Sequence, residues 1–221
     1  MEKVILVIRE ADIESYDHFT DRILKLAYRM GNDKNVLKLK VALTTSKPPS
    51  ISIIPFKKKK VAVISIHVKE DAFDKSNEIL GFAGRFRAEE ELPISYTKDW
   101  KNGNYSEGVC LLTLFKKKKS LDYLTFLDRW YNGHTPLSLK IHPLWNYNRN
   151  FVKVDGDHSE PWDGIVEEQF RQDSELLNPI KFFGNPMVMF YRMWQVYTDT
   201  KGFLDYNSIE PYFAREMHIK S

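Results

Sequence analysis

The stretch from Val4 to Thr44, VILVIREADIESYDHFTDRILKLAYRMGNDKNVLKLKVALT, indicates how the chain folds. Its first five residues are β-branched or leucine, which is typical of a buried strand. A helix is expected to begin at Asp12 or Ser15, because apolar side chains then recur every three or four residues, and to stop at Gly31. From Val36 to Thr44 apolar and polar residues alternate, as in a half-buried strand. The stretch therefore predicts a strand–helix–strand unit.

The same kinds of element continue and then repeat after a glycine-containing connector at residues 99–108. In the first part the expected segments are the apolar runs Ile51–Phe56 and Val61–Val68, a helix over Asp71–Leu80 and a strand over Arg85–Tyr96. In the second part they are a strand over Val109–Phe115, a long helix capped by Ser120, strands over Leu144–Val154 and Trp162–Phe170, mostly helix over Ser174–Tyr197, and a strand over Tyr212–Ile219. Each part has the order β-α-β-β-α-β of a ferredoxin-like unit. We therefore predict an α+β fold of two such units with antiparallel sheets, residues 1–98 and 109–221.

Composition narrows the class of protein. The 221 residues carry a formal net charge of only +3, and one cysteine excludes an intramolecular disulfide and a cysteine-based zinc cage. The apolar runs of the chain are too short for a signal peptide or a membrane span, so a soluble, cytoplasmic protein without a membrane partner is expected. Two lysine runs, Lys57–Lys60 and Lys116–Lys119, are interpreted as solvated turns, and no nucleic-acid partner is expected. No phosphate-binding loop, metal-binding helix motif or nucleophile elbow is present.

The densest set of chemically capable residues lies between Tyr123 and Asn150. Gly133 and Pro136 interrupt a helical pattern there, and we expect Thr135 to cap a second helical piece that starts at a new angle. His134 would lie at this break and point into a cavity, where a neutral imidazole can act as general acid or base. The alternative is a structural histidine bonded to a nearby backbone carbonyl.

The strand that follows has two chemically different faces. Trp145, Tyr147, Arg149 and Phe151 share one face, while Asn146, Asn148 and Asn150 share the other. Buried amides need hydrogen-bond partners, so the asparagine face is expected either to line a wet pocket or to be solvated. Which face meets the helices is left open. A polar loop at 155–160 that contains His158 is interpreted as solvated, and no metal site is predicted.

Four ordered segments in residues 109–219 resemble the EthD-like family. They are SLDYLTFLDRWYNGHTPL from Ser120, with its His-x-Pro-Leu ending, LWNYNRNFV from Leu144, PWDGIVEEQF from Pro161, and FLDYNSIEPYFAREMHI from Phe203. The first half resembles the family only in topology, as a degenerate copy without the His-x-Pro-Leu segment. The resemblance implies a dimeric α/β-barrel, in which two ferredoxin-like units pair their sheets, here within one chain. It also implies action on ethers or on aromatic and polyketide intermediates, although fold alone does not fix function.

The leading hypothesis is a cofactor-independent oxidoreductase, dehydratase or isomerase that acts on a small aromatic or polyketide-like molecule. His134 would move the proton, and Tyr147 with Arg149, or Asn146 with Asn148, would hold a carbonyl or enolate oxygen. The pocket walls would come from Trp130, Tyr131 and Trp145. Two alternatives remain: a haem-binding protein with a histidine axial ligand, and a non-catalytic binding or assembly module whose pocket is filled by aromatic side chains. A homodimer is the candidate assembly.

Overall fold

A computed structural model describes residues 1–69, 79–153 and 162–221 of the chain. The strands are β1 (Glu2–Arg9), β2 (Val36–Leu43), β3 (Val61–Val68), β4 (Phe82–Ile94), β5 (Val109–Phe115), β6 (Asn146–Lys153), β7 (Gly164–Phe170) and β8 (Glu210–Lys220). The helices are α1 (Tyr16–Gly31), α2 (Tyr123–Asp128), the π-helix η2 (Arg129–His134), α3 (Thr135–Ile141), α4 (Asp173–Leu177), α5 (Pro179–Phe183), α6 (Pro186–Phe203) and the 3-10 turn η3 (Tyr206–Ser208). Most of the predicted helix over Asp71–Leu80, and the loop with His158, lie outside the described residues.

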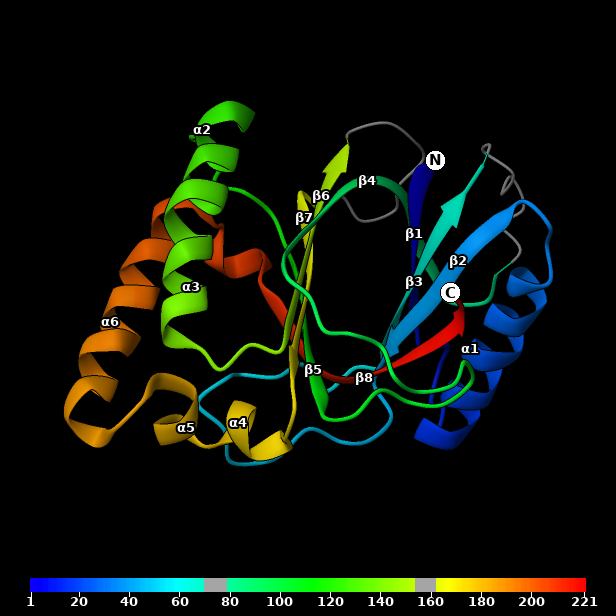
Figure 1. The fold of residues 1–221 in the computed structure, drawn as a ribbon, viewed down its shortest axis with the longest axis horizontal. Coiled ribbons are helices and arrows are strands. Elements are labelled where there is room, and N and C mark those ends of the chain that lie inside the picture. The colour runs from blue at the N-terminus through cyan, green and yellow to red at the C-terminus, as the bar shows by residue number, and fades with distance from the viewer. Residues whose placement is uncertain (70–78, 154–161) are drawn as a thin grey trace.

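The eight strands close into one antiparallel barrel in the order β1-β3-β2-β8-β5-β7-β6-β4 (Figure 1). The first four strands are adjacent as β4-β1-β3-β2, and the last four as β8-β5-β7-β6, so the strand order is the same in each half. The pairs β2–β8 and β4–β6 join the halves. The predicted α+β class is confirmed, and the barrel closes within a single chain.

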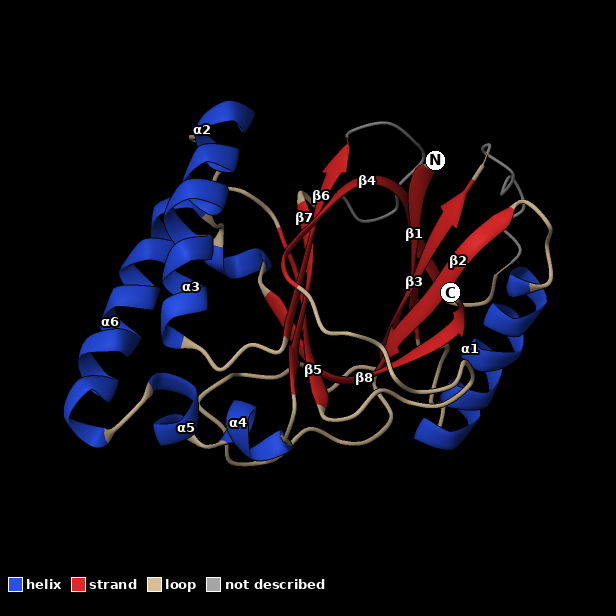
Figure 2. Cartoon of the chain, viewed as in Figure 1, coloured by secondary structure: helices blue, strands red, loops and turns tan. Residues whose placement is uncertain are grey.

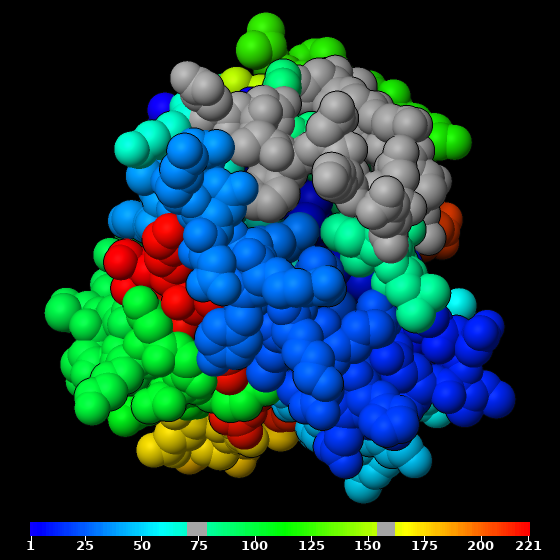
Figure 3. Space-filling view, turned by 90° about the vertical axis from the view of Figure 1, so that its right-hand side faces the viewer, coloured from blue at the N-terminus to red at the C-terminus, as the bar shows by residue number. Residues whose placement is uncertain are grey.

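Two helical layers flank the barrel (Figure 2). Helix α1 covers the outer face of the first half, where Phe19, Ile23 and Ala27 pack against Val4, Leu6 and other strand residues. Figure 3 shows this face, with α1 in blue. Helices α2 to α6 cover the outer face of the second half through a mostly aromatic cluster that includes Trp130 and Phe203. Successive side chains of each strand point to opposite faces of the sheet. Those that point inward form a third apolar cluster, which fills part of the barrel interior.

The region around His134 differs from the prediction. Helix α2 begins at Tyr123 and is capped by Asp122, whose carboxylate accepts from the Thr125 N–H at 2.8 Å, and not by Ser120. Thr135 has helical dihedrals (φ −61°, ψ −49°), so it does not cap a second helix. The π-helix η2 absorbs the interruption, and the helix continues through Gly133 and Pro136 into α3. Ile51–Phe56 forms no strand and runs as a loop.

A glycine fixes the turn into β5 and provides a test of the fold. Gly108 has φ +72°, and an added Cβ would lie 1.7 Å from the carbonyl oxygen of Phe170. Gly108→Ala is therefore expected to lower the free energy of unfolding by about 2 kcal/mol or more, measured by urea denaturation. Gly133→Ala is the control, since its Cβ would meet only Asp199 at 3.9 Å. Equal stability of the two variants would contradict this account of the turn.

None of the helices in the described part of the chain is long and apolar enough to span a membrane.

Candidate active site

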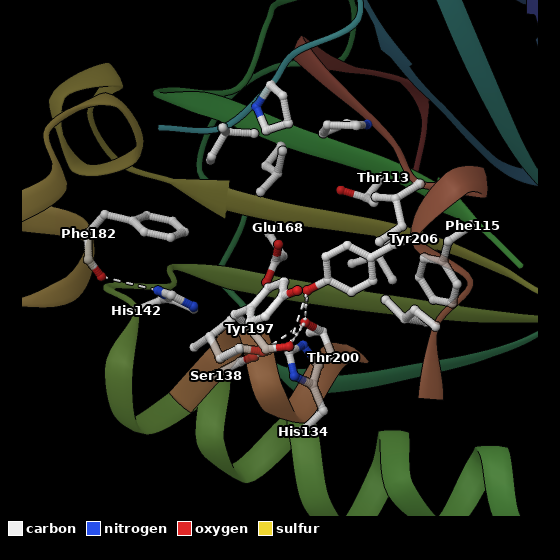
Figure 4. Close-up of a pocket in the computed structure, with 18 of the residues that line it drawn as sticks. Thr113, Phe115, His134, Ser138, His142, Glu168, Phe182, Tyr197, Thr200 and Tyr206 are labelled. Carbon is white, nitrogen blue, oxygen red and sulfur yellow. Dashed lines mark hydrogen bonds between the residues drawn. The ribbon is translucent and has the colours of Figure 1, made fainter. Parts of the chain in front are cut away.

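A cavity of about 490 Å³ lies between the outer face of the second-half strands (β5, β6, β7 and β8) and the helices of that half (Figure 4). Its floor comes from strand residues such as Leu111, Phe115 and Val166, and its roof from η2, α3, α5 and α6. The loop of residues 53–57 forms a further wall. Most lining side chains are aromatic or aliphatic, with few polar groups among them, which is the usual character of a small-molecule site.

Glu168 places a carboxylate in this apolar cavity. It lies on β7 directly opposite Tyr147 of β6, and both side chains are on the face that meets the helices. Burial raises the pKa of Glu168 to about 7, because the charged form loses its hydration. Within residues 1–69, 79–153 and 162–221, no group hydrogen-bonds to this carboxylate. Glu168 can therefore accept or donate a proton near neutral pH.

His134 is held in a hydrogen-bonded series that ends at the cavity. Its Nδ1 lies 2.7 Å from Oδ2 of Asp199 on α6. Its Nε2 lies 3.1 Å from Oγ of Ser138, one turn further along the helix, and Figure 4 shows these two side chains. A carboxylate partner places the proton on Nδ1, so Nε2 accepts from the Ser138 hydroxyl. The two ring nitrogens of His134 thus contact a carboxylate and a hydroxyl, and neither contacts a backbone carbonyl. Both Ser138 and His134 line the cavity.

The series Ser138–His134–Asp199 has the order of groups found in hydrolytic triads, but its surroundings differ. Ser138 lies inside helix α3, where backbone N–H groups bond to carbonyls of the preceding turn, as the N–H of His142 does to the carbonyl of Ser138. An oxyanion hole needs such N–H groups free and aimed at the substrate. We therefore interpret the series as a proton relay.

Three other polar side chains of the cavity, His142, Thr200 and Tyr206, are bonded within the protein. His142 Nδ1 lies 3.1 Å from the carbonyl oxygen of Phe182, and its ring stacks on that of Phe182 at 4.0 Å. Burial lowers the pKa of His142 to about 4, so the ring is neutral at pH 7. The Thr200 hydroxyl lies 2.5 Å from that of Tyr206, which also contacts Tyr197 (Figure 4). These residues shape the cavity beside Glu168 and His134.

The predicted site residues fall into three places. Trp130, His134 and Tyr147 line the cavity. Arg149 lies behind it: its guanidinium stacks at 3.9 Å over Tyr131 and bonds to Thr135 and Glu91. Neither Arg149 nor Tyr131 is among the residues that line the cavity, so the structure does not bring them together with His134 there as predicted.

The remaining predicted residues lie elsewhere. Trp145 precedes β6 and packs against Tyr96 at 4.9 Å and Trp100 at 5.9 Å, away from the cavity. Asn146, Asn148 and Asn150 point into the barrel, where they are buried. The aromatic face of β6 therefore meets the helices, and the asparagines do not share a pocket with His134.

Glu168, Ser138 and Asp199 were not predicted from the sequence. Glu168 is one of two consecutive acids in a strand, and only alternation would have placed one of them on the helix side. Ser138 follows His134 by four residues, a spacing that predicts contact along a helix. No sequence signal pairs Asp199 with His134, because 65 residues separate them.

The raised pKa of Glu168 makes stability depend on pH. The folded state binds this proton more tightly than the unfolded chain does, so stability from the group is present below pH 4.5 and is lost as the pH rises to about 7. Glu168→Gln removes the titration. We expect the stability of the variant relative to the parent to increase from pH 4 to pH 8, by up to about 3 kcal/mol. Urea denaturation at pH 4 and pH 8 measures the free energy of unfolding of both proteins. The same difference between variant and parent at the two pH values would contradict a raised pKa.

A metal ion or a haem would need ligating side chains with free nitrogen, oxygen or sulfur atoms. No group of three or more metal-ligating side chains occurs in the three described ranges. An axial haem ligand needs a free imidazole nitrogen, and both nitrogens of His134 have partners. His142 is the better candidate, since its Nδ1 bonds to a carbonyl as in many metal-binding histidines.

Comparison with solved structures defines the fold class. An anthrone oxidase-like protein superposes with a TM-score of 0.63 at 10% identity, covering 98% of this chain and 91% of that one. A protein from Fusobacterium nucleatum subsp. nucleatum described as a "putative monooxygenase" superposes with a TM-score of 0.51 at 10% identity, covering 99% and 93%. The chain thus shares its overall fold with these two proteins. No family model and no curated protein matches the sequence.

Proposed function

We propose that the chain is a cofactor-independent oxidoreductase that removes a proton from a small aromatic or polyketide-like molecule. The observation that carries this proposal is Glu168, whose carboxylate has a pKa of about 7 in an aromatic cavity and accepts no hydrogen bond from the described residues. A base whose pKa lies near the working pH is the most effective one for proton abstraction. The cavity supplies apolar area for a flat substrate through side chains such as Trp130, Phe182 and Phe203.

The chemistry balances with dioxygen as the second substrate. Glu168 takes one proton from an acidic methylene flanked by aromatic rings and leaves a delocalised carbanion. The carbanion gives its electrons to dioxygen, a C–O bond forms, and Glu168 returns the proton to give a hydroperoxide. Removal of the second methylene proton and loss of water break the O–O bond. One methylene and one dioxygen molecule thus become one ketone and one water, and no external reductant is consumed.

His134 completes the proposed site through Ser138. The Ser138 hydroxyl passes a proton to or from Nε2 of His134, and Asp199 stabilises the imidazolium that forms. This relay can protonate the substrate oxygen while Glu168 acts on carbon. The predicted acid–base role of His134 is therefore kept, but it acts through a hydroxyl.

The structural neighbours support oxidative chemistry on such a substrate, since one is an anthrone oxidase-like protein and the other is described as a monooxygenase. The repeated strand order supports a further proposal, that the chain is a tandem duplication of an EthD-like, ferredoxin-like unit divided near residues 98 and 109. In this proposal only the second unit keeps an active cavity. Dehydratase and isomerase activities use the same first step, proton abstraction.

The test is oxygen uptake with an anthrone as substrate. We expect uptake above the rate in buffer, with one ketone formed per dioxygen consumed. Uptake at the buffer rate together with tight, saturable binding would support the non-catalytic binding module instead. A Soret band that shifts on titration with haem, and that is lost in His142→Gln, would support the haem alternative.

A homodimer remains part of the proposal. Helix α6 carries large exposed side chains, among them Met187, Phe190 and Trp194, which are 92%, 72% and 62% exposed. A contiguous apolar surface of this kind is typical of an interface. Analytical ultracentrifugation of the chain tests it, and a monomer at all concentrations would contradict it.

A further inference from the structure

A second cavity, of about 270 Å³, opens at one end of the barrel interior, away from the site between sheet and helices. Its lining includes Lys40 of β2, Ser65 and His67 of β3, Glu90 of β4, Asn148 of β6 and His218 of β8. The asparagine face of β6 therefore does line a pocket, but inside the barrel. The apolar cluster with Phe86, Trp162 and Tyr212 fills another part of the barrel interior.

Two carboxylates at this cavity, the partly buried Glu90 and the buried Glu216, are each held by a lysine and a histidine. Glu90 bonds to Lys3 at 2.5 Å and to His67 at 2.9 Å. Glu216 bonds to Lys40 at 3.2 Å and lies 3.2 Å from His218. Burial alone would raise the pKa of both carboxyls, but these cationic and hydrogen-bonding partners lower it, so both are ionised.

Polar atoms of the lining lack partners although they are buried. Oγ of Ser65 and Oδ1 of Asn148 have no hydrogen-bond partner in the described part of the chain, and both residues are 2% exposed. Deeper in the barrel, Oδ1 of Asn150 and both amide atoms of Gln169 are also unpartnered. Leaving such groups without partners costs roughly 1–3 kcal/mol each, so something that donates hydrogen bonds is expected there. Most of these atoms are acceptors.

Charge divides the cavity into two ends. At its inner end, which we call the floor, two lysines (Lys3 and Lys40) pair with three glutamates (Glu90, Glu167 and Glu216), so carboxylates outnumber ammonium groups by one there. Three further lysines line the cavity, Lys38, Lys98 and Lys220, and we call their side its mouth. The ammonium groups of Lys98 and Lys220 also donate to the backbone carbonyls of Trp100 and Asp33. Figure 3 shows the C-terminal residues of β8 in red at the surface of this side of the molecule.

We propose that this cavity binds a compact amino acid-like zwitterion. Its ammonium group would donate to Ser65 Oγ and Asn148 Oδ1 over the negative floor, and its carboxylate would face the lysines of the mouth. Binding requires both ends, since a cation is opposed by the mouth and an anion by the floor. The proposal uses none of the residues of the cavity that holds Glu168, and it stands independently of the proposed function.

Calorimetry of the full chain with 4-aminobutyrate, butylamine and butyrate tests the proposal. We expect saturable binding of 4-aminobutyrate and at least tenfold weaker binding of the two half-molecules. Equal binding of butylamine would overturn the role of the mouth lysines, and equal binding of butyrate would overturn that of the floor. Absence of binding by all three probes would show that water alone fills the cavity and would overturn the proposal.

Substitutions in each cavity show which of the two binds 4-aminobutyrate. Ser65→Ala removes one acceptor with little change in volume, and Lys98→Met removes one charge at the mouth, where misfolding is not expected. Each should weaken 4-aminobutyrate binding by roughly fivefold, the effect of one hydrogen bond or ion pair. Glu168→Gln, in the other cavity, should leave it unchanged. Loss of binding in Glu168→Gln, with both barrel variants unaffected, would place the ligand in the other cavity and contradict the proposal.

Discussion

Replacement of Glu168 by glutamine is expected to lower kcat of the proposed oxidation by roughly 10²–10⁴-fold, the usual contribution of a positioned general base. Glutamine keeps the size of the side chain but cannot take a proton. In the parent protein the rate should fall as the pH drops below about 7, because burial raises the pKa of Glu168 to about 7 and protonation removes the base. A pH–rate profile of kcat/KM on both proteins measures the effect.

The control for this substitution is Glu89→Gln, on the exposed side chain of β4 that pairs with Lys153. It removes an exposed strand carboxylate that does not line the cavity and should retain full activity. If Glu168→Gln turned over substrate at the parental rate with the same pH profile, Glu168 would not be the base.

Replacement of His134 by glutamine is expected to lower kcat by roughly 10²-fold or more while the fold stays intact. Glutamine cannot carry a proton between the Ser138 hydroxyl and the Asp199 carboxylate, which contact the two ring nitrogens. Asp199→Asn should give a loss of similar kind, because the amide no longer stabilises an imidazolium. Steady-state kinetics and urea denaturation of each variant separate a loss of chemistry from a loss of structure.

His18→Gln provides the control, since His18 lies exposed on α1 on the opposite side of the barrel. Unchanged turnover in His134→Gln, at full stability, would remove His134 from the mechanism. A loss in His134→Gln that Ser138→Ala does not share would instead show that His134 contacts the substrate directly.

Local patterns predicted the fold well where burial and periodicity agree. The opening strand and helix were placed to within a few residues, because the apolar positions of α1 face one side of the sheet. The helix around His134 was predicted wrongly, since Pro136 and Gly133 indicate a break that a π-helix accommodates without one. Barrel closure is a tertiary property, and only the resemblance to the EthD-like family predicted it.

The site was only partly predictable. Trp130, His134 and Tyr147 were found because they are neighbours along a helix and the following strand. Arg149 was misplaced in the cavity because alternation puts it on the correct face but cannot show that Tyr131, Thr135 and Glu91 already hold it. Glu168 was missed because its chemistry depends on burial by helices distant in sequence. Such partners become visible only in three dimensions.

The central claim is that the cavity beside Glu168 removes a proton from carbon. Anaerobic exchange of the methylene protons of an anthrone in D₂O, followed by NMR, tests it directly and does not depend on the later reaction with dioxygen. We predict exchange well above the buffer rate with the parent chain and exchange at the buffer rate with Glu168→Gln. Equal exchange rates for the parent, the variant and buffer, with the ligand bound, would contradict the claim.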